Sequence, residues 1–167
     1  TLWHSSAASD VYKRQAFPLL LADDGLLAGY LAGDLNPSAV ELLEANLQRW
    51  TSKRETALLP AEVVCMDARA WKDELSLCGR AQAVLVNLPH DSFEHLPDLF
   101  PLFDRSCSSL LRGWAIVERD SLEGRVDQLN QLVHSAGGAA IATRVSEIKG
   151  FSTTRCFVVF QTTIAWN

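Results

Sequence analysis

The chain has 167 residues, of which 48% are hydrophobic and 21% are charged. This length and composition fit one globular domain and exclude an intrinsically disordered chain. Fifteen Lys and Arg against twenty Asp and Glu give a formal net charge of −5. That balance argues against a protein that binds nucleic acid by bulk charge alone.

The cysteines and the apolar stretches exclude further classes. The four cysteines are widely spaced and form no CxxC pair, so we expect reduced thiols, no disulfide framework and no metal site: Cys65, Cys78, Cys107 and Cys156. The longest apolar stretches, 17–22 and 81–86, are much shorter than the ~20 residues that span a bilayer. No hydrophobic signal segment opens the chain. We therefore expect a cytoplasmic monomer without a membrane partner.

The first fifteen residues differ in character from the rest of the chain. Residues 1–15 read TLWHSSAASDVYKRQ and show neither helical nor strand periodicity. They look like a translated cloning or adapter junction, so we interpret them as a non-native or disordered segment; a natural, poorly ordered N-terminus is the alternative. The predicted domain is residues 16–167.

In the first part of this domain, apolar runs alternate with amphipathic stretches. The pattern predicts the tail of a helix over 16–23, a strand over 26–33, a helix from Pro37, a strand over 61–66 and a short helix over 71–77. Asn36 is expected to cap the first full helix. Its buried stripe is expected to be Val40, Leu43, Leu47 and Trp50.

The second part continues the alternation. The pattern predicts strands over 81–86 and 114–117, with a mostly helical stretch over 92–111 that two prolines interrupt. A capping pair, Asp120 and Glu123, is expected to start a helix that ends at Gly137-Gly138. Strands over 141–148 and 156–163 are expected to form a terminal antiparallel pair.

Strands that alternate with helices predict an α/β fold with a mostly parallel sheet covered on both faces. Ligands of such sheets bind at the carboxyl ends of the strands. Three segments come directly after strands here: Asp34-Leu35-Asn36, Asp67-Ala68 and Asn87-Leu88-Pro89. We expect them to lie along one edge and to form the functional site.

The residue types at these strand ends suit a nucleoside and a planar base. Asp34 offers two acceptor oxygens to the vicinal hydroxyls of a ribose, and Asp67 an acceptor to an adenine amine. Asn87, together with free backbone carbonyls held rigid by Pro89, is expected to hydrogen-bond the edge of a base. The structural alternatives are turn-capping carboxylates and a simple Asn-x-Pro turn.

These blocks carry a family resemblance. DLNPSAVELLEANL, VVCMDARAW and VLVNLPHDSFEHLPDLF, in this order and spacing, resemble the catalytic domain of the archaeal and eukaryotic tRNA (guanine(37)-N(1))-methyltransferases. The resemblance implies a Rossmann-like class I methyltransferase sheet with a C-terminal antiparallel pair, S-adenosylmethionine as cofactor and tRNA as partner. It further implies methyl transfer to N1 of the guanosine 3′ of the anticodon.

Carried over to this sequence, the resemblance assigns cofactor contacts to Asp34, Leu35, Asp67, Ala68 and Asn87. Asn87 and Pro89 would face the target base and take part in catalysis.

In the family, the first strand, its glycine-rich loop, the general base and the RNA-binding domains precede the part matched here. We therefore expect a partial domain that lacks the first strand, binds cofactor weakly and is inactive alone. The alternatives are another class I methyltransferase, a wybutosine-pathway aminocarboxypropyl transferase, a nicotinamide-dependent dehydrogenase and an inactive interaction domain.

Overall fold

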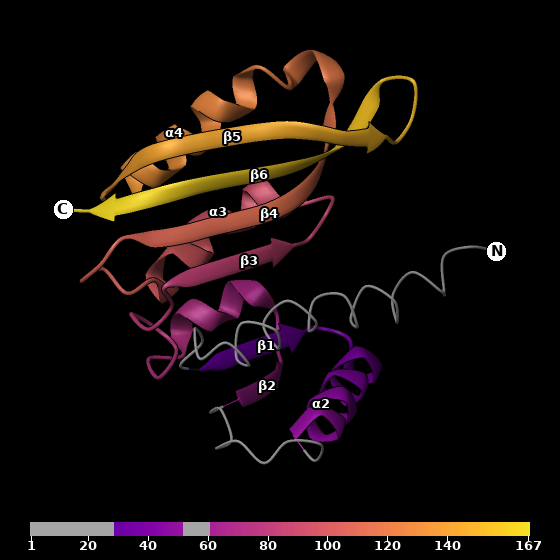
Figure 1. Ribbon diagram of the computed structural model, residues 1–167, viewed down its shortest axis with the longest axis vertical. Helices are drawn as coiled ribbons and strands as arrows, with labels where there is room; N and C mark the ends of the chain where they lie inside the picture. The colour runs from indigo at the N-terminus through magenta and orange to yellow at the C-terminus, as the bar shows by residue number, and fades with distance from the viewer. Residues whose placement is uncertain (1–28, 52–60) are drawn as a thin grey trace. The chain divides into compact units, whose positions relative to one another are not determined.

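The computed structural model describes residues 29–51 and 61–167. The adapter-like segment 1–15 and the helix tail expected over 16–23 lie outside these residues, as does the side chain of Trp50. The chain divides after Ala68 into two units, and each is described by itself (Figure 1).

The first unit is a strand–helix–strand motif. Strand β1 (Tyr30–Asp34) pairs in parallel with β2 (Ala61–Cys65), and helix α2 (Pro37–Thr51) connects them. The helix begins where the sequence predicts, because the Asn36 side chain accepts a hydrogen bond from the Ser38 N–H at 3.0 Å. This bond satisfies one of the helix's otherwise unpaired first donors and confirms the expected cap.

A small apolar cluster joins α2 to this parallel pair. Ala32 of β1 and Leu43 of α2 are buried, and Ala39 and Val63 pack against them. Val40 is also buried, whereas Leu47 is half-buried, so the predicted stripe is confirmed at its N-terminal end. Burying a side chain such as Leu43 contributes roughly 1.5–3 kcal/mol, which holds the start of the helix beside the strand ends.

The second unit is built on a four-stranded mixed sheet. Its strands are β3 (Ala83–Asn87), β4 (Ser109–Glu118), β5 (Gly138–Gly150) and β6 (Arg155–Trp166), in the order β3-β4-β6-β5. β3 and β4 are parallel, while β6 is antiparallel to both of its neighbours. The predicted terminal antiparallel pair is confirmed, and its second strand inserts between β4 and β5.

Two helices lie behind this sheet in Figure 1, α3 (Ser92–Leu99) and α4 (Gly124–Ser135). Every second residue of β4 and of β6 is buried, which is the pattern of strands with one face in a core. Phe93 of α3 meets Phe160 of β6, with ring centroids 4.9 Å apart. Leu129 and Val133 form the buried face of α4.

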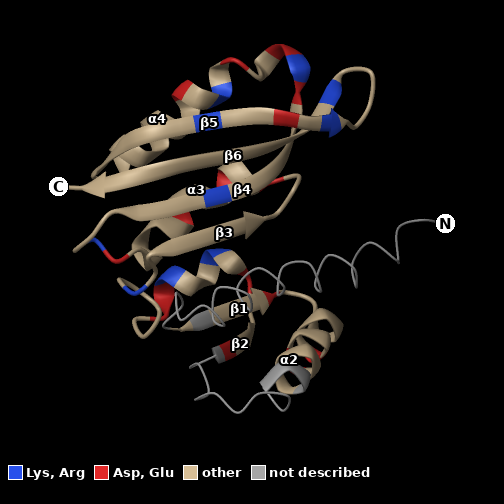
Figure 2. Ribbon diagram, viewed as in Figure 1, with Lys and Arg blue, Asp and Glu red and all other residues tan. Residues whose placement is uncertain are grey.

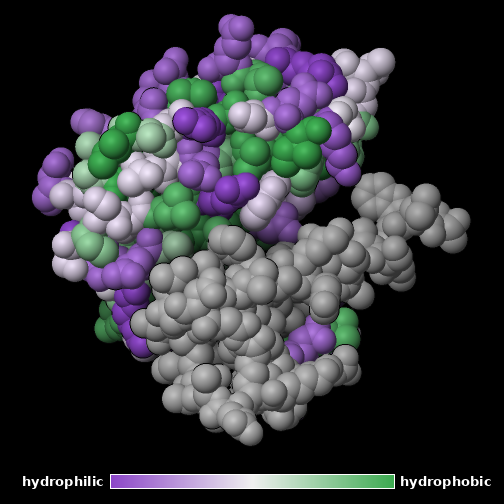
Figure 3. All heavy atoms as spheres, in the orientation of Figure 1, coloured by the Kyte–Doolittle hydropathy of each residue, from purple (hydrophilic) through white to green (hydrophobic). Residues whose placement is uncertain are grey.

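The opposite face of this sheet is less buried. Figure 3 shows hydrophobic residues interspersed with hydrophilic ones on the visible face of the second unit. Leu85 of β3, for example, is 43% exposed, whereas its neighbour Val86 points to the helical side and is buried. The strand therefore presents Leu85 and Asn87 to the same face, because successive side chains alternate.

Three short 3-10 helices connect these elements: η1 (Ala68–Asp73), η2 (Phe100–Leu102) and η3 (Arg119–Ser121). The short helix expected over 71–77 is thus a 3-10 turn that starts earlier. Within residues 29–51 and 61–167, no helix is both long enough and apolar enough to cross a membrane.

Two expectations about the second unit are wrong. The helical stretch expected over 92–111 ends at Leu99, because Pro101 cannot continue the helix. The strand expected over 114–117 is confirmed and is longer, as the ten-residue β4. Glu123 does not cap α4: its backbone is already helical and its side chain makes no capping bond. The predicted end of α4 is confirmed, since Gly137 has a φ of +85°, which a glycine adopts without strain.

Candidate functional site

The carboxyl ends of β1 and β2 lie side by side. Asp34 pairs with Cys65 in the parallel register, and the Asp34 carbonyl accepts a hydrogen bond from the Met66 N–H at 3.2 Å. Asp67 comes directly after Met66 and is half-buried, as is Asp34. The structure therefore brings the two predicted aspartates to adjacent strand ends of the first unit.

Asp34 also holds a turn, which is the role that the structural alternative gives it. Its Oδ1 accepts the Asn36 N–H at 2.9 Å. A carboxylate has about four lone-pair positions, and this bond uses one of them. The turn also leads directly into α2, whose positive end lies beside this strand end.

The two remaining predicted cofactor residues of this unit differ in their surroundings. Leu35 is 67% exposed, an unusual position for a large apolar side chain, while Ala68 is half-buried at the start of η1. The Leu35 side chain is thus available for packing against a ligand, which is the role that the family resemblance assigns to it.

In the second unit, Asn87 ends β3 and a tight turn comes next. The Asp91 N–H donates to the Leu88 carbonyl at 2.9 Å, so residues 88–91 form a β-turn with Pro89 at its second position. Proline favours that position because its fixed φ suits the turn. This turn directs the chain into α3 and leaves His90 exposed.

The expectation of free backbone carbonyls after Asn87 is wrong for Leu88 and Pro89. The Leu88 carbonyl accepts from the Asp91 N–H and from the Ser92 hydroxyl, and the Pro89 carbonyl accepts the Ile116 N–H at 2.7 Å. All three bonds are made within the protein. The polar side chain at this strand end is therefore Asn87 itself.

Ser92 is a residue that the sequence reasoning missed. It is only 1% exposed, and its Oγ lies 2.8 Å from the Leu88 carbonyl oxygen and 2.6 Å from that of Trp114. It therefore connects the turn after Asn87 to the neighbouring strand β4. The only signal in the sequence is a serine four residues after Leu88, which is too common to be informative.

A small polar cavity lies beside this turn, with a volume of about 120 Å³. Its charged lining residues are Asp91, Glu94 and Arg125. The Arg125 guanidinium donates to Gln128 at 2.6 Å and lies over the Phe93 ring, while its Nε is buried without a hydrogen-bond partner. With about 30 Å³ per water, this cavity has the size of a few water molecules and is too small for a nucleoside.

Paired charges lie farther along the same end of the sheet (Figure 2). Arg119 donates to Glu147 at 2.8 Å, and Arg155 donates to Glu118 at 2.6 Å. The hydrogen bond from Arg155 lowers the pKa of Glu118 below its ordinary value. Lys149 lies over the Phe157 ring in the same region. Since most of these cations have an acidic partner, this edge carries little net charge.

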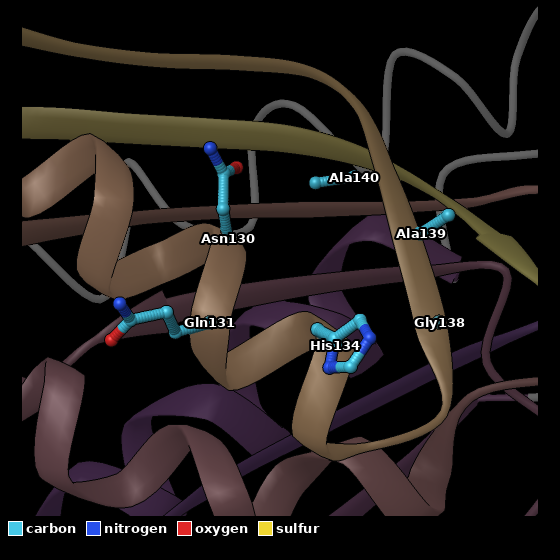
Figure 4. A pocket seen from close by; sticks show the side chains of 6 residues that line it. All are labelled: Asn130, Gln131, His134, Gly138, Ala139 and Ala140. Carbon is cyan, nitrogen blue, oxygen red and sulfur yellow. The ribbon is translucent and has the colours of Figure 1, made fainter.

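Figure 4 shows a larger, open hollow between α4 and β5, with a volume of about 410 Å³. Asn130, Gln131 and His134 border it from the helix, and Gly138 lies at the start of β5. Gly138 pairs with Trp166, near the amino end of β4. Because ligands of open α/β sheets bind at the carboxyl ends of parallel strands, this hollow is not the candidate site.

The predicted site residues therefore fall into two groups. Asp34, Leu35, Asp67 and Ala68 lie in the first unit, and Asn87 and Pro89 lie in the second. A common ligand site for both groups stays a prediction. In the part of the chain that the structure describes, no group of three or more His, Cys, Asp or Glu is arranged to hold a metal ion.

No protein-family model matches this sequence, and no curated protein matches it significantly. Solved structures do match its fold. TYW2 from M. jannaschii, in complex with AdoMet, superposes with a TM-score of 0.70 at 18% identity, over 84% of this chain and 59% of its own. Trm5b from Pyrococcus abyssi gives a TM-score of 0.62 at 15% identity, over 83% of this chain and 38% of its own.

A third match is aTrm5 in its complex with tRNALeu, with a TM-score of 0.54 at 15% identity, over 84% of this chain and 35% of that protein. This chain thus spans 59% or less of the length of these three proteins. At identities this low, the structural similarity establishes the fold alone, and any chemistry must be argued from the site residues. The chain has the α/β fold of the class I S-adenosylmethionine-dependent methyltransferases.

Proposed function

We propose that this chain is the C-terminal part of an S-adenosylmethionine-dependent tRNA methyltransferase that modifies N1 of the guanosine 3′ of the anticodon. One observation carries the proposal: Asp34 and Asp67 lie on adjacent parallel strand ends, in a chain whose fold is that of these methyltransferases. Similar folds solved with AdoMet and with tRNALeu support the cofactor and partner classes.

The two aspartates fit the polar groups of the cofactor's nucleoside. Asp34 would accept hydrogen bonds from the ribose hydroxyls, with the exposed Leu35 packed beside the sugar. Asp67 would accept from the adenine amine, with Ala68 against the ring. A carboxylate matches both tasks because it accepts hydrogen bonds and donates none when ionised.

S-adenosylmethionine, when bound, supplies a methyl group on a positively charged sulfonium. Transfer of this methyl group to guanine N1 would require that the N1 proton leave to a general base. Asn87 would orient the guanine edge through its amide, and Pro89 would fix the turn behind it. We assign the general base and the loop around the methionine moiety to sequence outside this chain.

The target base must leave its stack to reach such a site. We therefore propose that tRNA binding depends mainly on domains outside this chain, in agreement with its net charge of −5. On this proposal, the chain alone binds cofactor weakly and transfers no methyl group.

Isothermal titration of the chain with S-adenosylhomocysteine tests the cofactor site. We expect measurable but weak binding that Asp34→Asn reduces at least tenfold. Asn at this position still accepts the Asn36 N–H, so the turn is preserved and unfolding in urea should change little. Asp98→Asn is the matched control, because Asp98 is a carboxylate of the second unit paired with Lys72. Equal affinity of Asp34→Asn and the original chain contradicts the site, and micromolar affinity contradicts the expected weakness.

A second transfer reaction uses the same cofactor, namely aminocarboxypropyl transfer. The fold does not separate the two reactions, because matches at 18% and 15% identity establish the fold alone. Mass spectrometry of the tRNA product of a protein that contains this chain separates the two reactions. The proposal requires a mass gain of one methyl group on guanine, and the larger aminocarboxypropyl gain would overturn it.

A further inference from the structure

The turn after β3 is attached to β4 by two polar connections. The first is the hydrogen bond from the Ile116 N–H to the Pro89 carbonyl, at 2.7 Å. The second runs through the Ser92 hydroxyl, which lies between the carbonyl oxygens of Leu88 and Trp114. Asn87 pairs with Trp114 in the parallel register. The bonded carbonyls, those of Leu88 and Pro89, are therefore one and two residues after Asn87, and their partners on β4 are Trp114 itself and Ile116, two residues after it.

A single hydroxyl serves two acceptors at this point. Serine has one O–H proton, and its Oγ lies 2.8 Å from the Leu88 oxygen and 2.6 Å from the Trp114 oxygen. The proton is therefore shared between two carbonyls that belong to different segments. The Leu88 oxygen is also satisfied by the Asp91 N–H, at 2.9 Å.

Burial makes this link stronger than a surface hydrogen bond. Ser92 is 1% exposed, so water does not replace its hydroxyl in the folded structure. Removing one partner of a buried hydrogen bond leaves the other unsatisfied, at a cost of roughly 1–3 kcal/mol. Here the Trp114 oxygen would lose its link to the turn, while Leu88 would keep its bond to Asp91.

We propose that Ser92 is a positioning residue, whose hydroxyl holds the Asn87–Pro89 turn against β4 and so fixes the Asn87 amide toward the substrate base. The part about the base rests on the proposed function, whereas the part about the turn does not. Ser92 touches no substrate in this proposal and acts through Asn87.

The chain supplies a matched control in Ser109. It is also buried, at 2% exposed, and its Oγ donates to a main-chain carbonyl, that of Asp104, at 3.2 Å. It lies at the start of β4, whereas Trp114 and Ile116 lie farther along that strand. Ser92→Ala and Ser109→Ala therefore each remove a buried hydroxyl, Ser92 at the start of α3 and Ser109 at the start of β4, where Ser109 Oγ also accepts from the Trp166 Nε1–H at 3.0 Å.

Amide hydrogen exchange of the full chain tests the link to the turn. We expect Ser92→Ala to speed exchange of the Ile116 amide at least tenfold more than the loss of global stability alone would. The loss of global stability is measured by urea unfolding. Ser109→Ala should change Ile116 only as much as global stability changes. Ser92→Thr, which keeps a hydroxyl, should restore slow exchange. Equal Ile116 exchange in the two alanine variants, after this correction, overturns the positioning role.

The second arm measures the effect on the base. Guanosine is titrated into the S-adenosylhomocysteine-bound chain, followed by the side-chain amide resonances of Asn87. The apparent affinity for guanosine, obtained from these resonance shifts, should fall at least tenfold in Ser92→Ala. It should be unchanged in Ser109→Ala. If the original chain shows no shift, the part of the proposal about the base fails, while the exchange result still decides whether Ser92 holds the turn. An unchanged shift in Ser92→Ala overturns the action through Asn87.

Discussion

Gly113 of β4 makes the closest backbone approach next to the candidate site, and we predict that Gly113→Ala destabilises the second unit. A Cβ added there would lie 2.8 Å from the Val86 carbonyl oxygen and 2.8 Å from Cε1 of Phe160. Gly113 pairs with Val86 in the parallel register, directly before Asn87. The side-chain ring could rotate away, but the carbonyl oxygen moves only if β3 itself shifts.

The magnitude comes from overpacking a core position. Extra atoms in a well-packed core cost typically 1–3 kcal/mol, while replacing glycine lowers the entropy of the unfolded chain and offsets about 0.4–1 kcal/mol. We expect a net loss of about 1 kcal/mol. With a urea dependence of about 2 kcal/mol per molar for a domain of this size, the unfolding midpoint should fall by roughly 0.5 M.

Urea unfolding monitored by circular dichroism checks this value. The control is Gly124→Ala at the start of α4, where an added Cβ meets no atom within 4 Å, and its midpoint should be unchanged or slightly higher. The double variant Gly113→Ala/Phe160→Leu should lose less unfolding free energy than the two single variants lose together. The difference should be at least about 0.5 kcal/mol, since the two residues are in contact. A Gly113→Ala midpoint equal to that of the control would refute the argument from close approach.

Three further predictions concern single interactions. Asn36→Ala should destabilise the first unit by about 1 kcal/mol through loss of the α2 cap, seen as faster amide exchange in the first turn of that helix; Asn36→Asp, which keeps the acceptor, should restore most protection. The pKa of Glu118 lies below its ordinary 4.5 because Arg155 donates to it, so this pair stabilises the fold above pH 4.5 and the contribution is lost as pH falls through the lowered pKa. Arg155→Gln should return the Glu118 titration midpoint, measured by NMR, toward 4.5, and an unchanged midpoint would contradict the pairing. Burial raises the pKa of the Cys156 thiol, whereas Cys65 is exposed; a thiol reagent should label Cys65 in the native protein and Cys156 only in urea, and native labelling of Cys156 would contradict its burial.

Local signals are sufficient to predict where α2 begins and which residues of its first turns are buried. Asn36 before Pro37 combines a side chain that accepts a helix N–H with a residue whose φ already suits a helix, and the helix starts there. The apolar spacing of Val40 and Leu43 predicts the buried face of the same helix. Both features depend on residues within one or two turns of each other, so a sequence pattern is able to reveal them.

Local signals fail where a distant segment decides the structure. Residues 109–111 are predicted to be helical, yet they form the start of β4. Leu111 is fully buried in the core, and it pairs with Thr162 of β6. The partner strand is about fifty positions away, and no short pattern reveals it. The capping pair at Asp120 fails for a related reason: η3 already turns the chain, so Glu123 enters α4 with helical angles.

The same distinction applies to the candidate site. The strand end at Asn87 is confirmed, and the turn after it, which is the structural alternative, is also present because proline at the second turn position is a local preference. How the backbone of this turn is bonded depends on Ile116 and Ser92, since the Ile116 N–H donates to the Pro89 carbonyl and the Ser92 hydroxyl lies between the carbonyls of Leu88 and Trp114. A tripeptide of the same sequence, placed beside a strand without these partners, would present its backbone to solvent. The chemistry of the motif is therefore a property of the β3–β4 pair, and variants of Ser92 or Gly113 should change it without altering any residue of the motif.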